Sequence, residues 1–278
     1  MALPTIEKLD CDSMLNADAD WDHFASAWYK DHNYGQLGDD DRQIIEQMRE
    51  FFASAGVRRG YGLDVGTGSN LYPALGMLPF CREIVLLDCS KANVAWLKEE
   101  VKNPNRSWDP FWAVLQGHRS YANIGNYREL LRRRAWVRRG NLLEPGSRRQ
   151  YDIGTMFFMA ESSTSSKAEF GQAVRRFIAS LKNRAPFAIA FMVGSEGYEV
   201  KDRWYPAVEI DRCDMEECLQ GVAKVDCIHE TIRREPPLRT GYIGMSLATG
   251  WALGARDGGS GYEIGTTKKS LGHMAGIS

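Results

Sequence analysis

The feature that most constrains this chain is a glycine turn that interrupts an apolar run. Residues 62–70 read Gly-Leu-Asp-Val-Gly-Thr-Gly-Ser-Asn, and a second apolar run, residues 84–88, ends in Asp88. Each run is typical of a buried strand, and Asp88 follows Gly68 by 20 residues. Glycines let a ligand approach the backbone, and a carboxylate at the end of the next strand can accept hydrogen bonds from two ribose hydroxyls. This spacing predicts a site for an adenosine-containing cofactor.

Two details of the turn separate the possible cofactors. A fingerprint for NAD or a flavin has a glycine or alanine three residues after Gly68, where this chain has Leu71. The acid inside the turn, Asp64, would repel a pyrophosphate but attract the ammonium group of S-adenosylmethionine (SAM). The charge pattern therefore favours SAM, with S-adenosylhomocysteine (SAH) as its product. A dinucleotide, or an ordinary turn without a ligand, remains an alternative.

Composition and charge narrow the class of protein further. The chain has 278 residues, of which 44% are hydrophobic and 26% charged, and its net charge is −1. This balance gives no global field that would attract nucleic acid or an anionic membrane. No apolar run approaches the length of a membrane span, the six cysteines form no CxxC pair, and the five histidines show no metal-ligand spacing. We therefore expect a cytoplasmic protein with reduced thiols, no metal and a small-molecule substrate; its oligomeric state stays open.

The sequence around and after the turn alternates predicted strands and helices. Strands are expected to end at Val65 and Asp88 and to cover residues 135–138, 153–159, 186–193, 224–233 and 242–251. Helices are expected to begin at the acids 39–41, after Ser90, near 127, at a Ser166/Glu169 capping box and at 211–214. This order predicts an α/β fold with a Rossmann-like, doubly wound, seven-stranded sheet that ends in a late antiparallel strand.

Three regions are expected along the chain. Residues 1–38 are predicted to form an N-terminal helical lid, in which Phe24 and Trp28 share one helix face with Tyr29 beside them. Residues 39–252 are predicted to form the cofactor-binding domain. Residues 253–278 are glycine-rich and polar, which is typical of a flexible tail without its own core. The aromatic- and glycine-containing segment 103–127 is predicted to be either an irregular insertion over the site or a long surface loop.

Four segments carry a resemblance to a known family. They are the aromatic cluster Phe24, Trp28 and Tyr29; the turn from Asp64 to Tyr72; Asp88-Cys89-Ser90-Lys91-Ala92-Asn93; and Phe158-Met159-Ala160-Glu161 with the later Tyr198. Through them, residues from about 20 to 250 resemble the nicotinamide/phenylethanolamine/indolethylamine N-methyltransferases. The resemblance implies a class I, SAM-dependent methyltransferase (EC 2.1.1) that methylates a small aromatic amine or an indole-type metabolite, at nitrogen or at an indole carbon.

The resemblance also implies roles for individual residues in binding the cofactor. Tyr29 and Tyr72 would donate hydrogen bonds to the methionine carboxylate, and Asp88 would accept from both ribose hydroxyls. Asn141 would meet the adenine amine at a position where the family more often has aspartate. The full set of cofactor-binding residues is Tyr29, Asp64, Gly66, Thr67, Gly68, Asn70, Tyr72, Asp88, Asn93, Asn141, Leu142, Phe157 and Phe158.

On the acceptor side, the resemblance implies a catalytic residue and departs from the family at two positions. Glu161 would hold a substrate amine or take its proton through water. Phe191 and the pair Gly241-Tyr242 stand where relatives that methylate nicotinamide or phenylethanolamine have acids, which favours a flat, weakly charged aromatic acceptor. The implied substrate-binding residues are Phe24, Trp28, Glu161, Phe191, Tyr198 and Tyr242.

Three other functions remain open at this point. They are an NAD-linked oxidoreductase on the same fold, a nucleic-acid methyltransferase, and a non-catalytic SAM-binding module. A nucleic-acid enzyme is disfavoured because residues 157–160 lack the prolines of its usual motif. Arginine outnumbers lysine, which is consistent with a GC-rich bacterial genome and with a role in specialised (secondary) metabolism.

Overall fold

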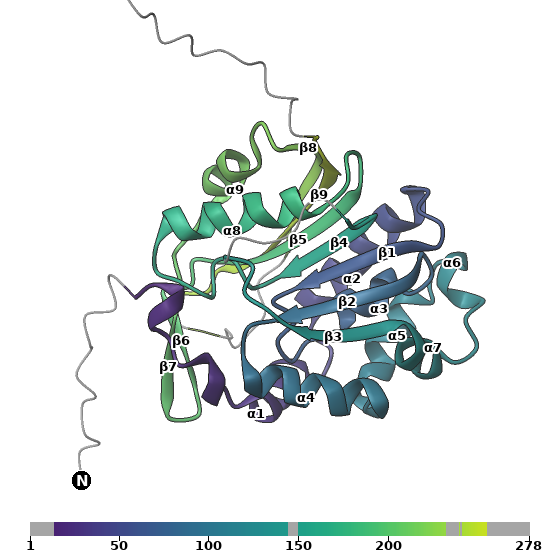
Figure 1. Cartoon of the computed structure of the whole chain (residues 1–278), viewed down its shortest axis with the longest axis horizontal. Helices are drawn as coiled ribbons and strands as arrows, with labels where there is room; N and C mark the ends of the chain where they lie inside the picture. The colour runs from purple at the N-terminus through teal and green to yellow at the C-terminus, as the bar shows by residue number, and fades with distance from the viewer. Residues whose placement is uncertain (1–13, 144–149, 232–238, 240, 255–278) are drawn as a thin grey trace, which may run out of the picture.

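The architecture is a mixed seven-stranded sheet between two helical layers (Figure 1). The computed structural model describes residues 14–143, 150–231, 239 and 241–254. The strand order is β3-β2-β1-β4-β5-β9-β8. Five strands pair in parallel: β1 (Gly60–Val65), β2 (Cys81–Asp88), β3 (Ala135–Arg139), β4 (Ile153–Phe157) and β5 (Pro186–Val193). β9 (Gly244–Ala252) is antiparallel to β5 and to β8 (Ala223–Glu230). The predicted fold class is confirmed.

The central strands are apolar on both faces because helices cover both sides of the sheet. One hydrophobic cluster joins the sheet to α2 (Asp39–Ser54), α3 (Tyr72–Met77), α4 (Lys91–Lys102), α5 (Asp109–Leu115) and α7 (Tyr127–Arg134). The other joins it to α8 (Lys167–Ser180) and α9 (Arg212–Leu219). The sheet order reverses between β1 and β4, and the carboxyl ends of these two strands form the usual ligand crevice of such folds.

Most of the predicted helix N-termini are capped by the residues that the sequence predicted. The Ser90 hydroxyl caps α4, and Asp211 and Asp214 form the reciprocal capping box of α9. Ser166 caps α8, but the expected capping box is incomplete, because the Glu169 carboxylate accepts the backbone N–H of Asn16 at 2.9 Å instead. This contact fastens residues 14–34, which we call the N-terminal segment, to α8.

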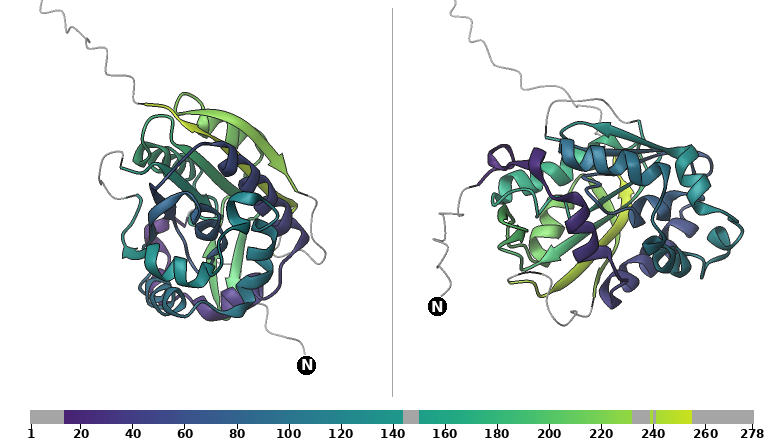
Figure 2. Two further views of the ribbon diagram at one scale, coloured as in Figure 1. Left: turned by 90° about the vertical axis from the view of Figure 1, so that its right-hand side faces the viewer. Right: turned by 90° about the horizontal axis from the view of Figure 1, so that it is seen from below.

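Segment 103–127 is neither an insertion over the cavity nor a surface loop, so that prediction is wrong. It contains α5 and the short helix α6 (Arg119–Ala122), and it leads into α7. Trp108, Phe111 and Tyr121 are fully buried, and the Tyr121 hydroxyl donates to the Gly76 carbonyl at 2.7 Å. Figures 1 and 2 show α6 at one end of the molecule, away from residues 14–23, whereas Trp108 packs against Tyr34 of α1 with 6.2 Å between the ring centres. The aromatics therefore build core beside α2 and α3.

The N-terminal segment differs from the predicted helical lid in one respect. α1 (Ser26–Tyr34) begins after Phe24, so Phe24 and Trp28 do not share a helix face. Phe24 packs against Tyr205 of a hairpin that the sequence did not reveal, β6 (Gly197–Val200) with β7 (Arg203–Pro206). Trp28 instead stacks on His32, with 4.7 Å between the ring centres. The predicted C-terminal tail lies outside the described residues except for its first two positions.

Candidate functional site

A cavity opens at the carboxyl ends of β1, β2 and β4, where the sheet order reverses. Together with its open mouth it encloses about 750 Å³ of space that no protein atom fills. Its walls come from the N-terminal segment, the glycine turn, the ends of β2, β3 and β4, and the β6–β7 hairpin. The lining residues are Asn16, Trp21, Phe24, Tyr29, Tyr34, Val65, Gly66, Thr67, Gly68, Ser69, Asn70, Leu87, Asp88, Cys89, Asn93, Gly140, Asn141, Leu142, Phe157, Phe158, Met159, Ser162, Ser163 and Tyr198.

The glycine turn after β1 uses most of its own backbone donors. Gly66 and Gly68 have positive φ angles of 61° and 57°, and a Cβ on Gly66 would lie 2.1 Å from Met159 Cγ. The N–H groups of Gly66 and Thr67 donate to the Leu87 carbonyl, and that of Gly68 donates to Asp88 at 2.7 Å. A phosphate-binding loop presents such N–H groups to its ligand. This turn presents side chains instead.

Three buried polar atoms at the turn have no partner among the described residues: Asp64 Oδ2, Ser69 Oγ and Asn70 Nδ2. Ser69 and Asn70 line the cavity, and Asp64 lies just behind the turn on β1. The other carboxylate oxygen of Asp64 accepts from the Thr155 hydroxyl at 2.7 Å. Burial raises the pKa of Asp64 to about 7. Unpaired buried polar groups are unfavourable, so this cluster indicates a polar ligand.

Asp88 is held rigidly at the end of β2. Its Oδ1 accepts from the Ser90 N–H at 2.9 Å and from the Asn93 amide at 3.3 Å, while Oδ2 accepts from Gly68. Asn93 is oriented in turn by the Ser26 hydroxyl, 2.7 Å from its Oδ1. Burial raises the pKa of Asp88, although these hydrogen bonds act in the opposite direction. Oδ1 already accepts two hydrogen bonds, whereas Oδ2 can still accept a further one from a ligand.

Most of the expected cofactor-binding residues lie together in the cavity wall. Tyr29, Asn141, Leu142, Phe157 and Phe158 line it with the turn, Asp88 and Asn93. Phe158 has a φ of 56°, which is strained for a bulky residue and is common at functional sites.

Tyr72 lies outside the cavity wall. Its hydroxyl donates to Asp41 at 3.3 Å, and its ring stacks on Phe111 with 5.6 Å between the ring centres. The first turn of α3 therefore directs this side chain into the core beside α2 and α5, away from the place that the resemblance implied.

The expected acceptor-binding residues are divided between the cavity and the core. Phe24 and Tyr198 line the cavity, and the Tyr198 hydroxyl donates to the Ser162 carbonyl. Trp28, Phe191 and Tyr242 do not line it. Phe191 packs against Phe170 on the face of the sheet that α8 and α9 cover. The Tyr242 hydroxyl donates to Asp40 of α2 at 2.8 Å. The two positions that favoured a weakly charged acceptor therefore do not face the cavity.

Glu161, the expected catalytic residue, is fully buried and does not line the cavity, whereas its neighbour in the chain, Ser162, does. Its Oε1 accepts from the Met192 N–H and from the Ser162 hydroxyl, both at 3.1 Å. Its Oε2 has no partner among the described residues, and burial raises its pKa. Ser162 lines the cavity and Glu161 does not, so the carboxyl group of Glu161 lies behind the Ser162 hydroxyl.

Sequence reasoning missed Arg239, which lies in the connection between β8 and β9. Its side chain is 8% exposed, and its guanidinium lies 3.9 Å from the centre of the Tyr198 ring. Nη1 donates to the Ser162 hydroxyl at 2.8 Å, and Nη2 donates to the Tyr29 hydroxyl at 2.6 Å. Neither periodicity nor a motif marks this arginine in the sequence, because only the tertiary fold brings it to the site.

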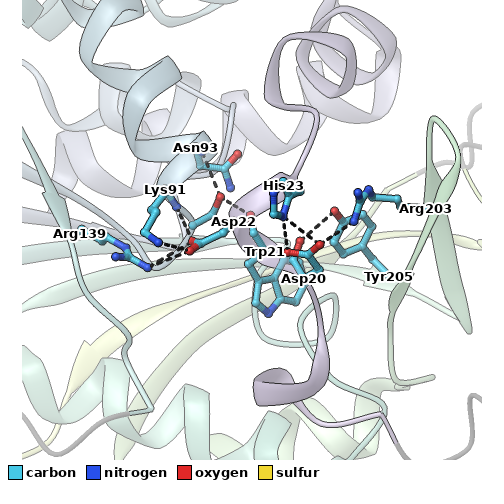
Figure 3. Close-up of polar contacts among 10 residues, drawn as sticks. Asp20, Trp21, Asp22, His23, Lys91, Asn93, Arg139, Arg203 and Tyr205 are labelled. Carbon is cyan, nitrogen blue, oxygen red and sulfur yellow. Dashed lines mark hydrogen bonds and ion pairs between the residues drawn. The ribbon is translucent and has the colours of Figure 1, made fainter.

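Ion pairs join the N-terminal segment to α4, β3 and the β6–β7 hairpin (Figure 3). The Asp22 carboxylate contacts the Lys91 ammonium at 2.9 Å and Arg139 at 3.2 Å. Asp20 contacts Arg203 of the β6–β7 hairpin at 2.6 Å and His23 at 2.8 Å. Hydrogen bonds from these partners lower the pKa values of both aspartates. Trp21 and Phe24, which line the cavity, stand directly beside these pairs.

Among the described residues, no group of three or more histidine, cysteine, aspartate or glutamate side chains could hold a metal ion. None of the helices described is long and apolar enough to cross a membrane.

Comparisons with known proteins support the fold. No protein-family model and no curated protein sequence matches this chain. A SAM-dependent methyltransferase from Clostridium acetobutylicum matches at 10% identity and TM-score 0.53, over 82% of this chain and 98% of its own. One from Methanosarcina mazei matches at 10% identity and TM-score 0.52, over 73% and 97%. A putative one from Listeria monocytogenes matches at 8% identity and TM-score 0.51, over 76% and 98%. The chain therefore has the fold of SAM-dependent methyltransferases.

Proposed function

We propose that this protein is a SAM-dependent methyltransferase that acts on a small aromatic amine or an indole-type metabolite. The observation that carries the proposal is the chemistry of the turn after β1. The N–H groups of Gly66, Thr67 and Gly68 are used within the protein, whereas Asp64 and Asn70 keep unpaired polar atoms. Such a turn suits the amino-acid arm of SAM better than a pyrophosphate, which needs free N–H groups and no carboxylate.

The residues around the cavity fit the remaining parts of the cofactor. Asp88 keeps acceptor capacity at Oδ2 for a ribose hydroxyl, and Asn93 holds the carboxylate in place. Asn141, Leu142 and Phe157 offer an amide and apolar surface for adenine. The unpaired Oδ2 of Asp64 fits an ammonium group, directly or through water. When bound, SAM supplies a sulfonium methyl group that is already reactive.

The protein's own contribution to methyl transfer would be orientation and the exclusion of water. Trp21, Phe24, Phe158 and Tyr198 give the cavity aromatic walls that suit a flat acceptor. Holding the acceptor in line with the methyl group removes much of the entropic barrier, and a dry cavity weakens solvation of the reactants. We assign Glu161 a positioning role, because it orients the Ser162 hydroxyl without reaching the cavity.

An NAD-linked oxidoreductase is the main competing function. It has the same strand order at the crevice, but the pyrophosphate of its cofactor would meet the carboxylate of Asp64 at the turn. A non-catalytic SAM-binding protein would share the whole cofactor site and differ only in the absence of turnover.

The experiment is methyl transfer from an equal mixture of ordinary and ¹³C-methyl SAM to a panel of indoles and arylamines. A true product appears in mass spectrometry as a doublet, and tandem spectra locate the methyl group on nitrogen or carbon. The Asp88→Ala variant serves as the control that should lose the doublet. Binding of SAH without any doublet would leave a SAM-binding module, and binding of NAD alone would refute the proposal.

A further inference from the structure

One buried cation from the segment between β8 and β9 lies behind the cavity wall, in contact with residues that line the cavity. Arg239 is more than nine-tenths buried, and it reaches two cavity-lining residues at once, Ser162 and Tyr29. A third, Tyr198, supports the guanidinium with its ring face. Three independent contacts therefore hold this side chain in one orientation, which is costly for a residue of such high rotamer freedom.

The charge of Arg239 is not neutralised by a direct partner in the described part of the chain. Glu161 acts on it through space, but the two groups are linked by the Ser162 hydroxyl and make no ion pair there. Burial also favours the neutral form of Glu161. A buried guanidinium without a contacting carboxylate is unfavourable unless a ligand provides one. Ser162 and Tyr29 account for two of its five N–H groups.

Tyr29 adds a second donor at the same place. Its hydroxyl oxygen accepts from Arg239 at 2.6 Å, so its own hydrogen is directed elsewhere. Among the described residues that hydrogen has no acceptor, and Tyr29 lines the cavity. A guanidinium and a phenol side by side match the two oxygens of a carboxylate. Tyr72, the other phenol expected to bind a carboxylate, is turned away toward Asp41.

We propose that Arg239 and Tyr29 together form the binding site for the carboxylate of the cofactor's aminoacyl arm. This inference rests on the proposed function. The arm would lie with its ammonium group toward Asp64 and its carboxylate toward Arg239 and Tyr29. A residue between the antiparallel strands β8 and β9 would thereby contribute directly to cofactor binding. Arg239 would also connect the cofactor to Ser162, and through it to Glu161, on the acceptor side.

The test compares two nucleosides by calorimetry in the full chain: SAH, and 5′-methylthioadenosine, which has the same adenosine and sulfur but no aminoacyl arm. In Arg239→Gln, the affinity for SAH should fall about 10- to 100-fold, as expected for loss of a charged hydrogen bond. The affinity for methylthioadenosine should change less than about threefold. Arg239→Lys should recover part of the loss, and Tyr29→Phe should show a smaller loss of the same kind.

Arg82 provides a matched control, because its guanidinium lies 4.0 Å from the centre of the Tyr61 ring, far from the cavity. Arg82→Gln should leave both affinities unchanged. Equal weakening of both nucleosides in Arg239→Gln would make the arginine merely structural and overturn the inference. Unchanged SAH affinity would also overturn it. If the natural chain binds neither nucleoside, the proposed function itself fails.

Discussion

At the residue scale, Asp64 is the clearest sign that the site is built for a cation. A fully buried carboxyl group with one unpaired oxygen destabilises a protein unless something binds it. The pKa of Asp64 is raised to about 7 because burial outweighs the hydrogen bond from Thr155. A bound ammonium group would reverse that shift by favouring the carboxylate.

Asp64 should make stability depend on pH in a direction opposite to that of a salt-bridged acid. Between the ordinary value of 3.8 and about 7, the folded protein keeps a proton that the unfolded chain has released. The free energy of unfolding therefore falls as pH rises through this range, by at most about 4 kcal/mol from this group. Urea melts at several pH values should show a weaker decline for Asp64→Asn than for the natural chain. Parallel curves would contradict the assignment.

Asp88→Ala should weaken SAH binding about 10- to 100-fold, because the ribose loses a charged acceptor. It should also destabilise the turn, since the Gly68 and Ser90 N–H groups lose their partner. Asp152 offers a matched control: its carboxylate accepts the Tyr61 N–H at 2.8 Å and pairs with Lys182, at the other end of the strands. Calorimetry should find Asp152→Ala less stable but unchanged in SAH affinity. Equal SAH affinity in the two variants would refute the ribose assignment.

At the scale of elements, the N-terminal segment is fastened by pairs that are easy to break one at a time. Asp22 joins it to α4 and β3 through Lys91 and Arg139, and Asp20 joins it to the β6–β7 hairpin through Arg203. All of these groups lie near the surface, so salt should weaken them. The segment is therefore the element whose closure over the cavity should respond to ionic strength.

Asp22→Asn should speed hydrogen exchange in residues 14–34 several-fold (about two- to tenfold) and leave α8 unchanged. Raising the salt concentration should produce the same pattern in the natural chain. Exchange mass spectrometry with and without SAH measures both effects, and SAH should restore part of the protection. Lys102→Gln, which removes an exposed pair with Glu99 on the same helix as Lys91, is the control. Unchanged exchange in Asp22→Asn would show that apolar contacts alone hold the segment.

The sequence predicted the elements whose signals are local. Ser90 and Asp211 identified helix starts, and apolar runs ending in Val65 and Asp88 identified strands. Segment 103–127 was misjudged because its short helices bury aromatics such as Trp108 and show too few turns for a clear period. The same limit applied to the site. The place of Arg239 at the site and the orientation of Tyr72 into the core depend on contacts between segments far apart in the chain.

At the scale of the whole molecule, the sheet decides where a ligand binds but not which one. The strand order and the crevice between β1 and β4 suit both nucleotide-binding dehydrogenases and methyltransferases. The difference lies in a few polar groups at the crevice: the paired N–H groups of the turn, and the unpaired groups of Asp64 and Asn70.

The most direct test of this account is competitive binding of SAH and NAD to the natural chain, measured by calorimetry at equal concentrations. We predict saturable binding of SAH, stronger above pH 7 than below it as Asp64 ionises, and no displacement of SAH by NAD. Binding of NAD with displacement of SAH would contradict the claim that the turn after β1 accepts an aminoacyl nucleoside.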